Sequence, residues 1–140
     1  MDQMAGLSEA KFALLIRGEN VDWKQIEQEL DLSATSLRRK GDKINDLPLI
    51  IAEEDEWACI FPLTHPMGRD PELNAFLRHL ADRREQLQKL NETYQVIMRM
   101  VVKSDYAHMS YLLTHETLKC LDAVGLRLEI SSLSWGETGL

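Results

Sequence analysis

The strongest concentration of charge in the chain is a run of four carboxylates, Glu53-Glu54-Asp55-Glu56. Carboxylates can act as general acids or bases, but a general acid that works near neutral pH needs a pKa raised by burial. This run lies between two apolar stretches, where a solvated turn is expected. We therefore interpret the four carboxylates as a recognition feature for a basic partner rather than as catalytic groups.

Other residues that could carry chemistry lack the spacing that the chemistry requires. The histidines are His65, His79, His108 and His115. They form no His-x-x-x-His or His-Glu-x-x-His pair, so we interpret them as structural or exposed and expect no metal site. There is no Gly-x-Ser-x-Gly elbow, phosphate-cradling glycine loop or dinucleotide fingerprint. We expect no catalytic residues and no cofactor, and we predict that the protein is not an enzyme.

Basic residues cluster ahead of the acidic run, at Arg38, Arg39, Lys40 and Lys43. The first three, together with Trp57, could form a site that binds an anion such as a phosphate or a carboxylate. Alternatively, the cluster is a solvated loop whose charges face the acidic run. We favour this structural interpretation.

Composition places the chain among soluble globular proteins, with 44% hydrophobic and 28% charged residues. Its length predicts one domain over residues 1–140, with loose termini at 1–10 and 134–140. The net charge of -7 argues against nucleic-acid binding. Neither a membrane-spanning stretch nor a secretory signal is visible. Cys59 and Cys120 are expected to be buried reduced thiols, so we predict a cytoplasmic protein without membrane contacts.

The apolar stretches on either side of the acidic run are expected to form the centre of the fold. Trp57 and Phe61 point to one side of the second stretch and Ala58 and Ile60 to the other. A strand that is apolar on both faces is covered on both faces. We therefore place residues 47–52 and 57–63 as a central antiparallel pair, in which something other than one helix layer must cover Ala58 and Ile60.

The remaining strands follow from alternating apolar residues. They are expected over residues 12–17, 94–103 and 126–131. Residues 32–44 show no periodicity and are interpreted as a polar connection in which Gly41 suits a positive φ. The order βαββαβαβ predicts an α+β fold, a ferredoxin-like split βαβ antiparallel sheet with helices on one face and an extra αβ unit.

Capping residues place the helices. Asp22 is expected to cap a helix of about ten residues. Asp70-Pro71 opens either one long helix or two that bend near Arg83. Thr114 caps the last helix, over residues 115–124, and Gly125 ends it.

Four segments carry a family resemblance when they are taken together. The first is the opening strand with its capped helix, which ends at Leu30-Asp31-Leu32, and the second is the connecting segment Arg39-Lys40-Gly41-Asp42. The third is the strand that contains Trp57. The fourth is the last helix, which is expected to pack through Leu118 and Leu121 and is followed, after Gly125, by a strand of alternating residues. Over roughly residues 11–132 the chain resembles a bacterial family catalogued as domain of unknown function 4279. The resemblance implies the fold and a bacterial origin, and it carries over no catalytic residues.

The function that we predict is protein recognition. A small acidic chain without catalytic motifs fits a non-enzymatic bacterial protein-binding module of the immunity type, which neutralises a basic toxin or effector. The predicted docking residues are Glu53, Glu54, Asp55, Glu56, Ala58 and Ile60. A homodimer through this surface is left open. The alternative function is a small-molecule sensing or regulatory module of ferredoxin-like type, with an anion bound at Arg38, Arg39, Lys40 and Trp57.

Overall fold

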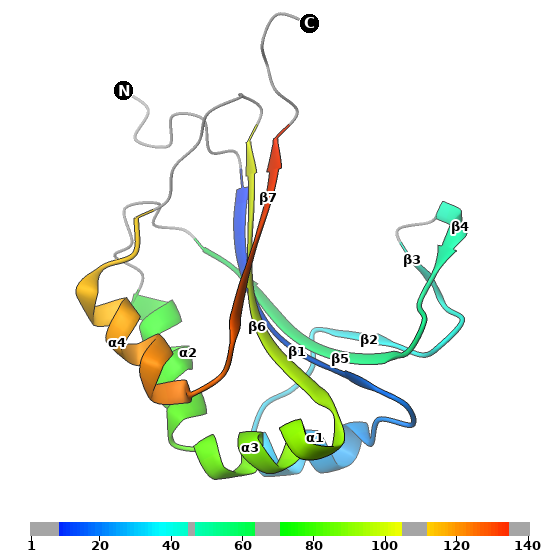
Figure 1. The fold of residues 1–140 in the computed structure, drawn as a ribbon, viewed down its shortest axis with the longest axis horizontal. Helices are drawn as coiled ribbons and strands as arrows, with labels where there is room; N and C mark the ends of the chain where they lie inside the picture. Colours follow the sequence, from blue (N-terminus) through cyan, green and yellow to red (C-terminus); the bar gives the residue numbers. More distant parts are fainter. Residues whose placement is uncertain (1–8, 45–46, 64–70, 105–111, 135–140) are drawn as a thin grey trace, which may run out of the picture.

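The computed structural model describes residues 9–44, 47–63, 71–104 and 112–134. The elements are β1 (Glu9–Gly18), α1 (Trp23–Leu30), β2 (Ser36–Arg38), β3 (Lys43–Ile44), β4 (Leu47–Ile51), β5 (Asp55–Pro62), α2 (Pro71–Ala81), α3 (Arg84–Thr93), β6 (Gln95–Ser104), α4 (His115–Val124) and β7 (Leu128–Ser134). The fold is α+β, with a five-stranded sheet in the order β2-β5-β1-β6-β7 and a separate two-stranded sheet of β3 and β4. The helices gather on one side of the curved main sheet, and β3 and β4 project on the other side (Figure 1).

β1 is the central strand of the main sheet because it is apolar on both faces. Phe12, Leu14 and Ile16 on the helix side are buried, and so are Ala13 and Leu15 on the opposite side. The strand pairs antiparallel with β5 along one edge and with β6 along the other. The first strand predicted from the sequence is therefore confirmed, and it occupies the central place that we expected for a later strand.

The predicted central strand pair does not form. β5 lies beside β1, whereas β4 pairs with β3 outside the main sheet. The backbone between β4 and β5 explains the difference. Ala52 N–H donates to the Asp42 carbonyl and the Gly41 N–H donates to the Ala52 carbonyl, both at 2.8 Å, so the chain is held here by the preceding connection. That connection contains β2 and β3, which are too short to show a period-two pattern.

The last helix and strand extend the main sheet, whereas the sequence left open whether they extend it or begin a second, partial copy of the unit. β7 pairs with β6 in parallel, so the sheet is mixed rather than antiparallel. α4 supplies the long connection that the two final strands require, because adjacent parallel strands cannot be joined by a tight hairpin. The strand order supports an α+β sheet with helices on one face and does not confirm the ferredoxin-like arrangement.

Side-chain caps begin two of the helices where the sequence predicts them. Gln25 N–H donates to Asp22 Oδ1 at 3.1 Å at the start of α1. Thr117 N–H donates to Thr114 Oγ1 at 3.2 Å at the start of α4. The last helix then ends at Gly125, whose φ of 76° lies in the left-handed region that glycine adopts readily.

α2 and α3 are separate helices, so of the two arrangements that the sequence left open the one with a bend near Arg83 is observed. The predicted Asp70 cap lies outside the described residues. α4 packs on α2 differently from our expectation, because Leu118 is 49% exposed whereas Thr117 is fully buried. Thr117 Oγ1 donates to Asn74 Oδ1 of α2 at 2.7 Å, so a buried polar pair takes the place predicted for Leu118. The other predicted contact residue, Leu121, is buried in the core, as expected.

Candidate functional site

The acidic run has one buried member, Asp55, at the first position of β5. This residue is only 6% exposed. Its Oδ2 accepts hydrogen bonds from Val21 N–H (3.1 Å) and Arg39 Nη1 (2.6 Å), and its Oδ1 accepts one from Lys40 N–H (2.9 Å). The hydrogen bond from the Lys40 backbone is the main cause of the lowered pKa of Asp55, whereas burial alone would raise that pKa. The prediction of four solvated carboxylates is wrong for Asp55, because donors from two other segments replace its water.

The residues of the predicted anion site do not converge on one space. The Arg39 guanidinium lies over the Trp23 ring, 3.6 Å from its centroid, in addition to binding the buried carboxylate. Arg38 Nη1 lies 3.8 Å from Glu56 Oε1. Trp57 is fully buried in the core. These ion pairs confirm for Arg38 and Arg39 the structural interpretation in which the basic charges face the acidic run, although Arg38 lies in strand β2 rather than in a loop.

Two members of the acidic run, Glu53 and Glu54, have side chains that are not held by a described ion pair. Glu56 is held, because its Oε2 accepts a hydrogen bond from Arg17 Nε at 2.7 Å on the neighbouring strand. Glu53 is exposed and Glu54 is half-buried. These two carboxylates are the part of the predicted acidic docking surface that another molecule can reach.

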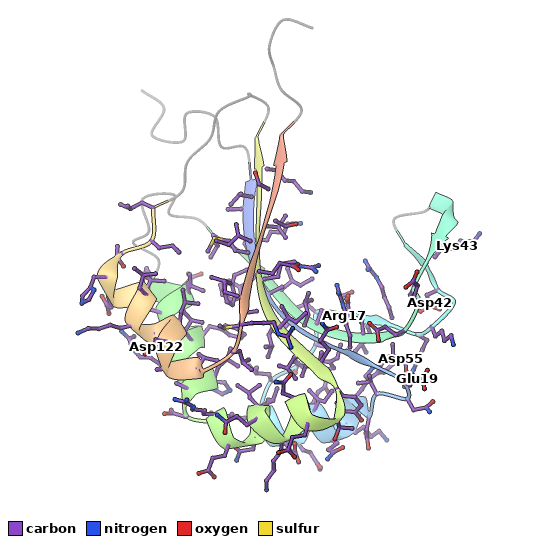
Figure 2. The ribbon with its side chains drawn as sticks, in the orientation of Figure 1. Arg17, Glu19, Asp42, Lys43, Asp55 and Asp122 are labelled. Carbon is purple, nitrogen blue, oxygen red and sulfur yellow. The ribbon has the colours of Figure 1, made fainter. Side chains whose placement is uncertain are left out.

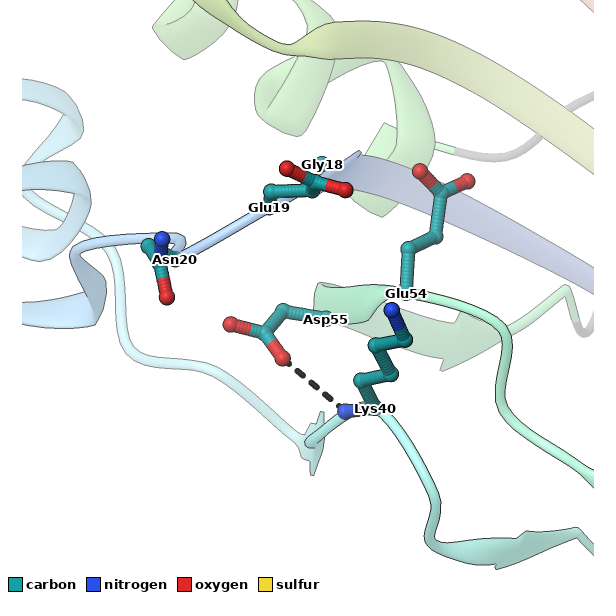
Figure 3. Close-up of a pocket in the computed structure, with 6 residues that line it drawn as sticks. All are labelled: Gly18, Glu19, Asn20, Lys40, Glu54 and Asp55. Carbon is teal, nitrogen blue, oxygen red and sulfur yellow. Dashed lines mark hydrogen bonds between the residues drawn. The ribbon is translucent and has the colours of Figure 1, made fainter.

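A hollow of about 230 Å³ lies beside them, between the β1–α1 turn, the start of β5 and the end of the basic cluster (Figure 3). It is lined by Gly18, Glu19, Asn20, Lys40, Glu54 and Asp55. The carboxylates of Glu19 and Asp55 come from different strand ends, and the dashed line in Figure 3 marks the bond from the Lys40 backbone to Asp55. We name Glu19, Glu53, Glu54 and Asp55 the acidic corner. Lys40 also lines the hollow and Arg39 already pairs with Asp55, so the negative charge offered to another molecule is that of Glu19, Glu53 and Glu54. Three carboxylates against one lysine suit a cationic group with hydrogen-bond donors rather than an anion.

Glu19 and Asn20 are not recognisable as site residues from the sequence, where they form part of a turn between a strand and a helix. The signal that identifies them is the strand register, in which Gly18 stands opposite Asp55. Figure 2 shows Arg17, Glu19, Asp42, Lys43 and Asp55 on the side of the sheet from which β3 and β4 project, and Asp122 on α4. The corner is therefore separate from the α4 side of the helix layer.

The predicted apolar docking residues lie on the sheet face opposite the helices. Ala13, Leu15 and Ala58 form a small buried cluster there, against which Ile60 packs. No helix of the described ranges covers this face (Figure 1). Ala58 is nevertheless 0% exposed and offers no surface, whereas Ile60 is half-buried. Long side chains beside the cluster, such as Arg99 opposite Ala13 in the register, can cover such small residues with their aliphatic stems.

Side chains that often serve catalysis have structural roles or low reactivity here. Cys59 and Cys120 are free thiols, and burial raises the pKa of Cys59, which keeps it protonated at neutral pH. His79 Nε2 donates to the Leu30 carbonyl at 2.8 Å, and its Nδ1 accepts from Arg83 Nη1 at 3.3 Å. Within the described ranges, no group of three or more His, Cys, Asp or Glu residues could hold a metal ion.

The fold and the acidic corner define an α+β domain with helices on one face of a mixed sheet and a polar hollow at one end of its central strands. The sequence model of the family described as Domain of unknown function (DUF4279) matches residues 8–135. The chain belongs to this family, which confirms the resemblance seen in the sequence. Comparisons with curated proteins and with solved structures found no match. In the part of the chain that the structure describes, no helix is long and apolar enough to span a membrane.

Proposed function

We propose that the chain is a non-enzymatic bacterial protein-binding module of the immunity type, which neutralises a basic toxin or effector in the cytoplasm by covering part of its surface. The observation that carries this proposal is the acidic corner with its open hollow, into which Glu19, Glu54 and Asp55 bring three carboxylates from two strand ends beside a single lysine, Lys40. Free thiols are consistent with a reducing compartment. The proposal retains Glu53 and Glu54 as partner contacts and adds Glu19.

The negative charge of the chain supports a basic partner both during long-range encounter and at direct contact. The net charge of -7 favours encounter with a cationic surface over distances up to about one Debye length, roughly 8–10 Å at moderate salt. At contact, a lysine or arginine side chain in the hollow would meet Glu19 and Glu54. Asp55 stays fixed by its three donors, so the floor of the hollow needs no rearrangement when a partner binds.

The chemistry of the described side chains supports binding rather than turnover. Asp55 is held ionised by its hydrogen-bond donors, which makes it a poor proton donor at neutral pH. The Cys59 thiol is held protonated and is a weak nucleophile.

Co-expression with the product of the neighbouring gene tests the proposal. We expect that product to be toxic and basic, and we expect the chain to restore growth. Glu19, Glu53 and Glu54 changed together to Gln should weaken protection. Three exposed carboxylates on α2 and α3 make a control of equal charge change, namely Glu72, Glu85 and Glu92, each replaced by Gln. A neighbour that is harmless, or equal protection by both triple variants, would contradict the proposal.

The alternative, a small-molecule sensing or regulatory module of ferredoxin-like type, has less support. Its proposed anion would require the Arg39 guanidinium, which already binds Asp55 and lies over Trp23. A thermal-shift screen of anionic metabolites decides between the two functions, because a ligand of the folded state raises apparent stability by mass action. A midpoint that rises with an anion would favour the sensing module.

A further inference from the structure

Lys40 differs from the two arginines before it in having no charged partner among the described residues. Arg38 pairs with Glu56, and Arg39 pairs with Asp55. The exposed side chain of Lys40 instead lines the hollow of the acidic corner, where no ion pair or side-chain hydrogen bond joins it to any residue that the structure describes. A lysine ammonium is a hydrated charge on a flexible stem, so this side chain can move without breaking a bond.

The backbone of Lys40 is held in place, which fixes where its side chain begins. The Lys40 N–H donates to Asp55 Oδ1 at 2.9 Å. The next residue, Gly41, donates its N–H to the Ala52 carbonyl at 2.8 Å. Because the turn is anchored at these two successive residues, the Lys40 side chain starts at the floor of the hollow, and Figure 3 shows it extending from there towards Glu54.

We propose that Lys40 is a built-in competitor for the cationic group that the acidic corner binds. Its side chain lines the same hollow as Glu19 and Glu54, so its ammonium offsets part of the negative charge that a lysine or arginine of the partner would meet. A partner must therefore displace this side chain or accept a like charge beside its own. The inference rests on the proposed function, because it concerns the cation that the same corner would bind.

Displacement of Lys40 makes the corner selective for strongly basic surfaces. A single exposed lysine of an unrelated protein gains little from entering the hollow, since it only exchanges one ammonium for another. A surface with several lysine or arginine residues also meets Glu53, which is exposed beside the hollow, and this second contact offsets the cost of moving Lys40. Lys40 would thus discriminate between partners by repelling weakly basic ones.

A direct contact between Lys40 and the partner would have the opposite effect on affinity. If the ammonium bound a carboxylate or a carbonyl of the partner, its removal would weaken binding. The surroundings of Lys40 favour competition instead, because an acidic group that approached it would also face the carboxylates of Glu19, Glu54 and Asp55 in the same hollow. Removal of the lysine charge should therefore strengthen the binding of a basic partner.

Two glutamine variants separate the position of this lysine from the net charge of the chain. Lys40→Gln removes the ammonium but keeps the backbone N–H that binds Asp55, so the structure of the corner should be retained. Lys119→Gln is the matched control, because Lys119 is also exposed and lies on α4, away from the corner. Both variants change the net charge equally, so a difference in affinity between them reports the local effect of Lys40.

Calorimetric titration of the full chain with a hexa-arginine peptide measures this effect without the natural partner. At low salt we expect Lys40→Gln to bind the peptide about 3–10-fold more tightly than wild type, and Lys119→Gln to stay within about twofold of wild type. The gain should become smaller at high salt, because salt screens the charges. Equal affinities of the two variants, weaker binding by Lys40→Gln, or no binding of the peptide by Lys40→Gln would overturn the inference.

The same titration with the product of the neighbouring gene separates this inference from the proposed function. We expect Lys40→Gln to bind that product more tightly than Lys119→Gln does. Binding of the product with equal affinity by the two variants would overturn the role of Lys40 and leave the proposed function standing. A product that the wild-type chain does not bind, together with tighter binding of hexa-arginine by Lys40→Gln, would overturn the proposed function and support the competition by Lys40.

Discussion

Replacing Asp55 by asparagine tests the residue that holds the acidic corner together. Asparagine keeps the size of the side chain, but it loses the negative charge and carries two N–H donors in place of one oxygen. Asp55 Oδ2 accepts from Val21 N–H and Arg39 Nη1, and Oδ1 accepts from Lys40 N–H. Either orientation of the amide therefore sets a donor against a donor. Arg39 keeps its position over Trp23 but loses its charged partner.

The expected loss follows from these contacts. A hydrogen bond to a charged group contributes about 1.5–3 kcal/mol, and removing one partner of a buried ion pair costs about 3–5 kcal/mol. The Arg39 side chain is 48% exposed, so solvent screens its share of the interaction. We therefore expect Asp55→Asn to lower the free energy of unfolding by about 3 kcal/mol and Tm by about 10 °C. Glu53→Gln, at the exposed neighbour, should stay within about 0.5 kcal/mol of wild type.

Urea unfolding followed by circular dichroism at several pH values measures the effect. The pKa of Asp55 is lower in the folded protein than in the unfolded chain. The ionised side chain therefore makes its full contribution to the free energy of unfolding above the ordinary carboxyl pKa of about 3.9. The contribution is lost as the pH falls through the folded pKa. The difference in the free energy of unfolding between wild type and Asp55→Asn should thus be largest near neutral pH and become smaller in acid. A loss below about 1 kcal/mol at neutral pH, or a difference that grows in acid, would refute the reasoning.

Three further substitutions test the local geometry, each by urea unfolding at neutral pH against wild type. Gly18→Ala should lower the free energy of unfolding by about 1–3 kcal/mol, because its Cβ would stand 2.8 Å from Tyr94 Cδ1. Gly125→Ala should lower it by about 1–2 kcal/mol, because φ is +76° and the Cβ would meet the Arg84 guanidinium at 3.0 Å. Thr114→Ala should lower it by about 1 kcal/mol through loss of the α4 cap. For each variant, a urea midpoint equal to that of wild type would contradict the structural role proposed for the substituted residue.

Features that depend on neighbouring residues could be predicted from the sequence. Asp22 and Thr114 act as caps because each side chain reaches a backbone N–H three residues later. Gly41 and Gly125 have φ values of 95° and 76° at the positions where a glycine was expected to turn the chain. No information from distant segments was needed for these predictions.

Strand pairing and the buried carboxylate depend on residues far away in the chain. The stretches that became β4 and β5 are similarly apolar, so composition could not show that only β5 joins the main sheet. The donors to Asp55 include Val21, 34 residues away, and Arg39, 16 residues away. Their approach follows from the register of β1 on β5, which no local pattern encodes.

The affinity of the acidic corner for a basic partner is the central claim of this account. Calorimetric titration with the product of the neighbouring gene, the partner that we propose, at low and at high salt, measures it most directly. We expect the variant in which Glu19, Glu53 and Glu54 are replaced by Gln to bind about 10–100-fold more weakly at low salt and to depend less on salt than wild type. Identical affinity and identical salt dependence of the two proteins would contradict the claim.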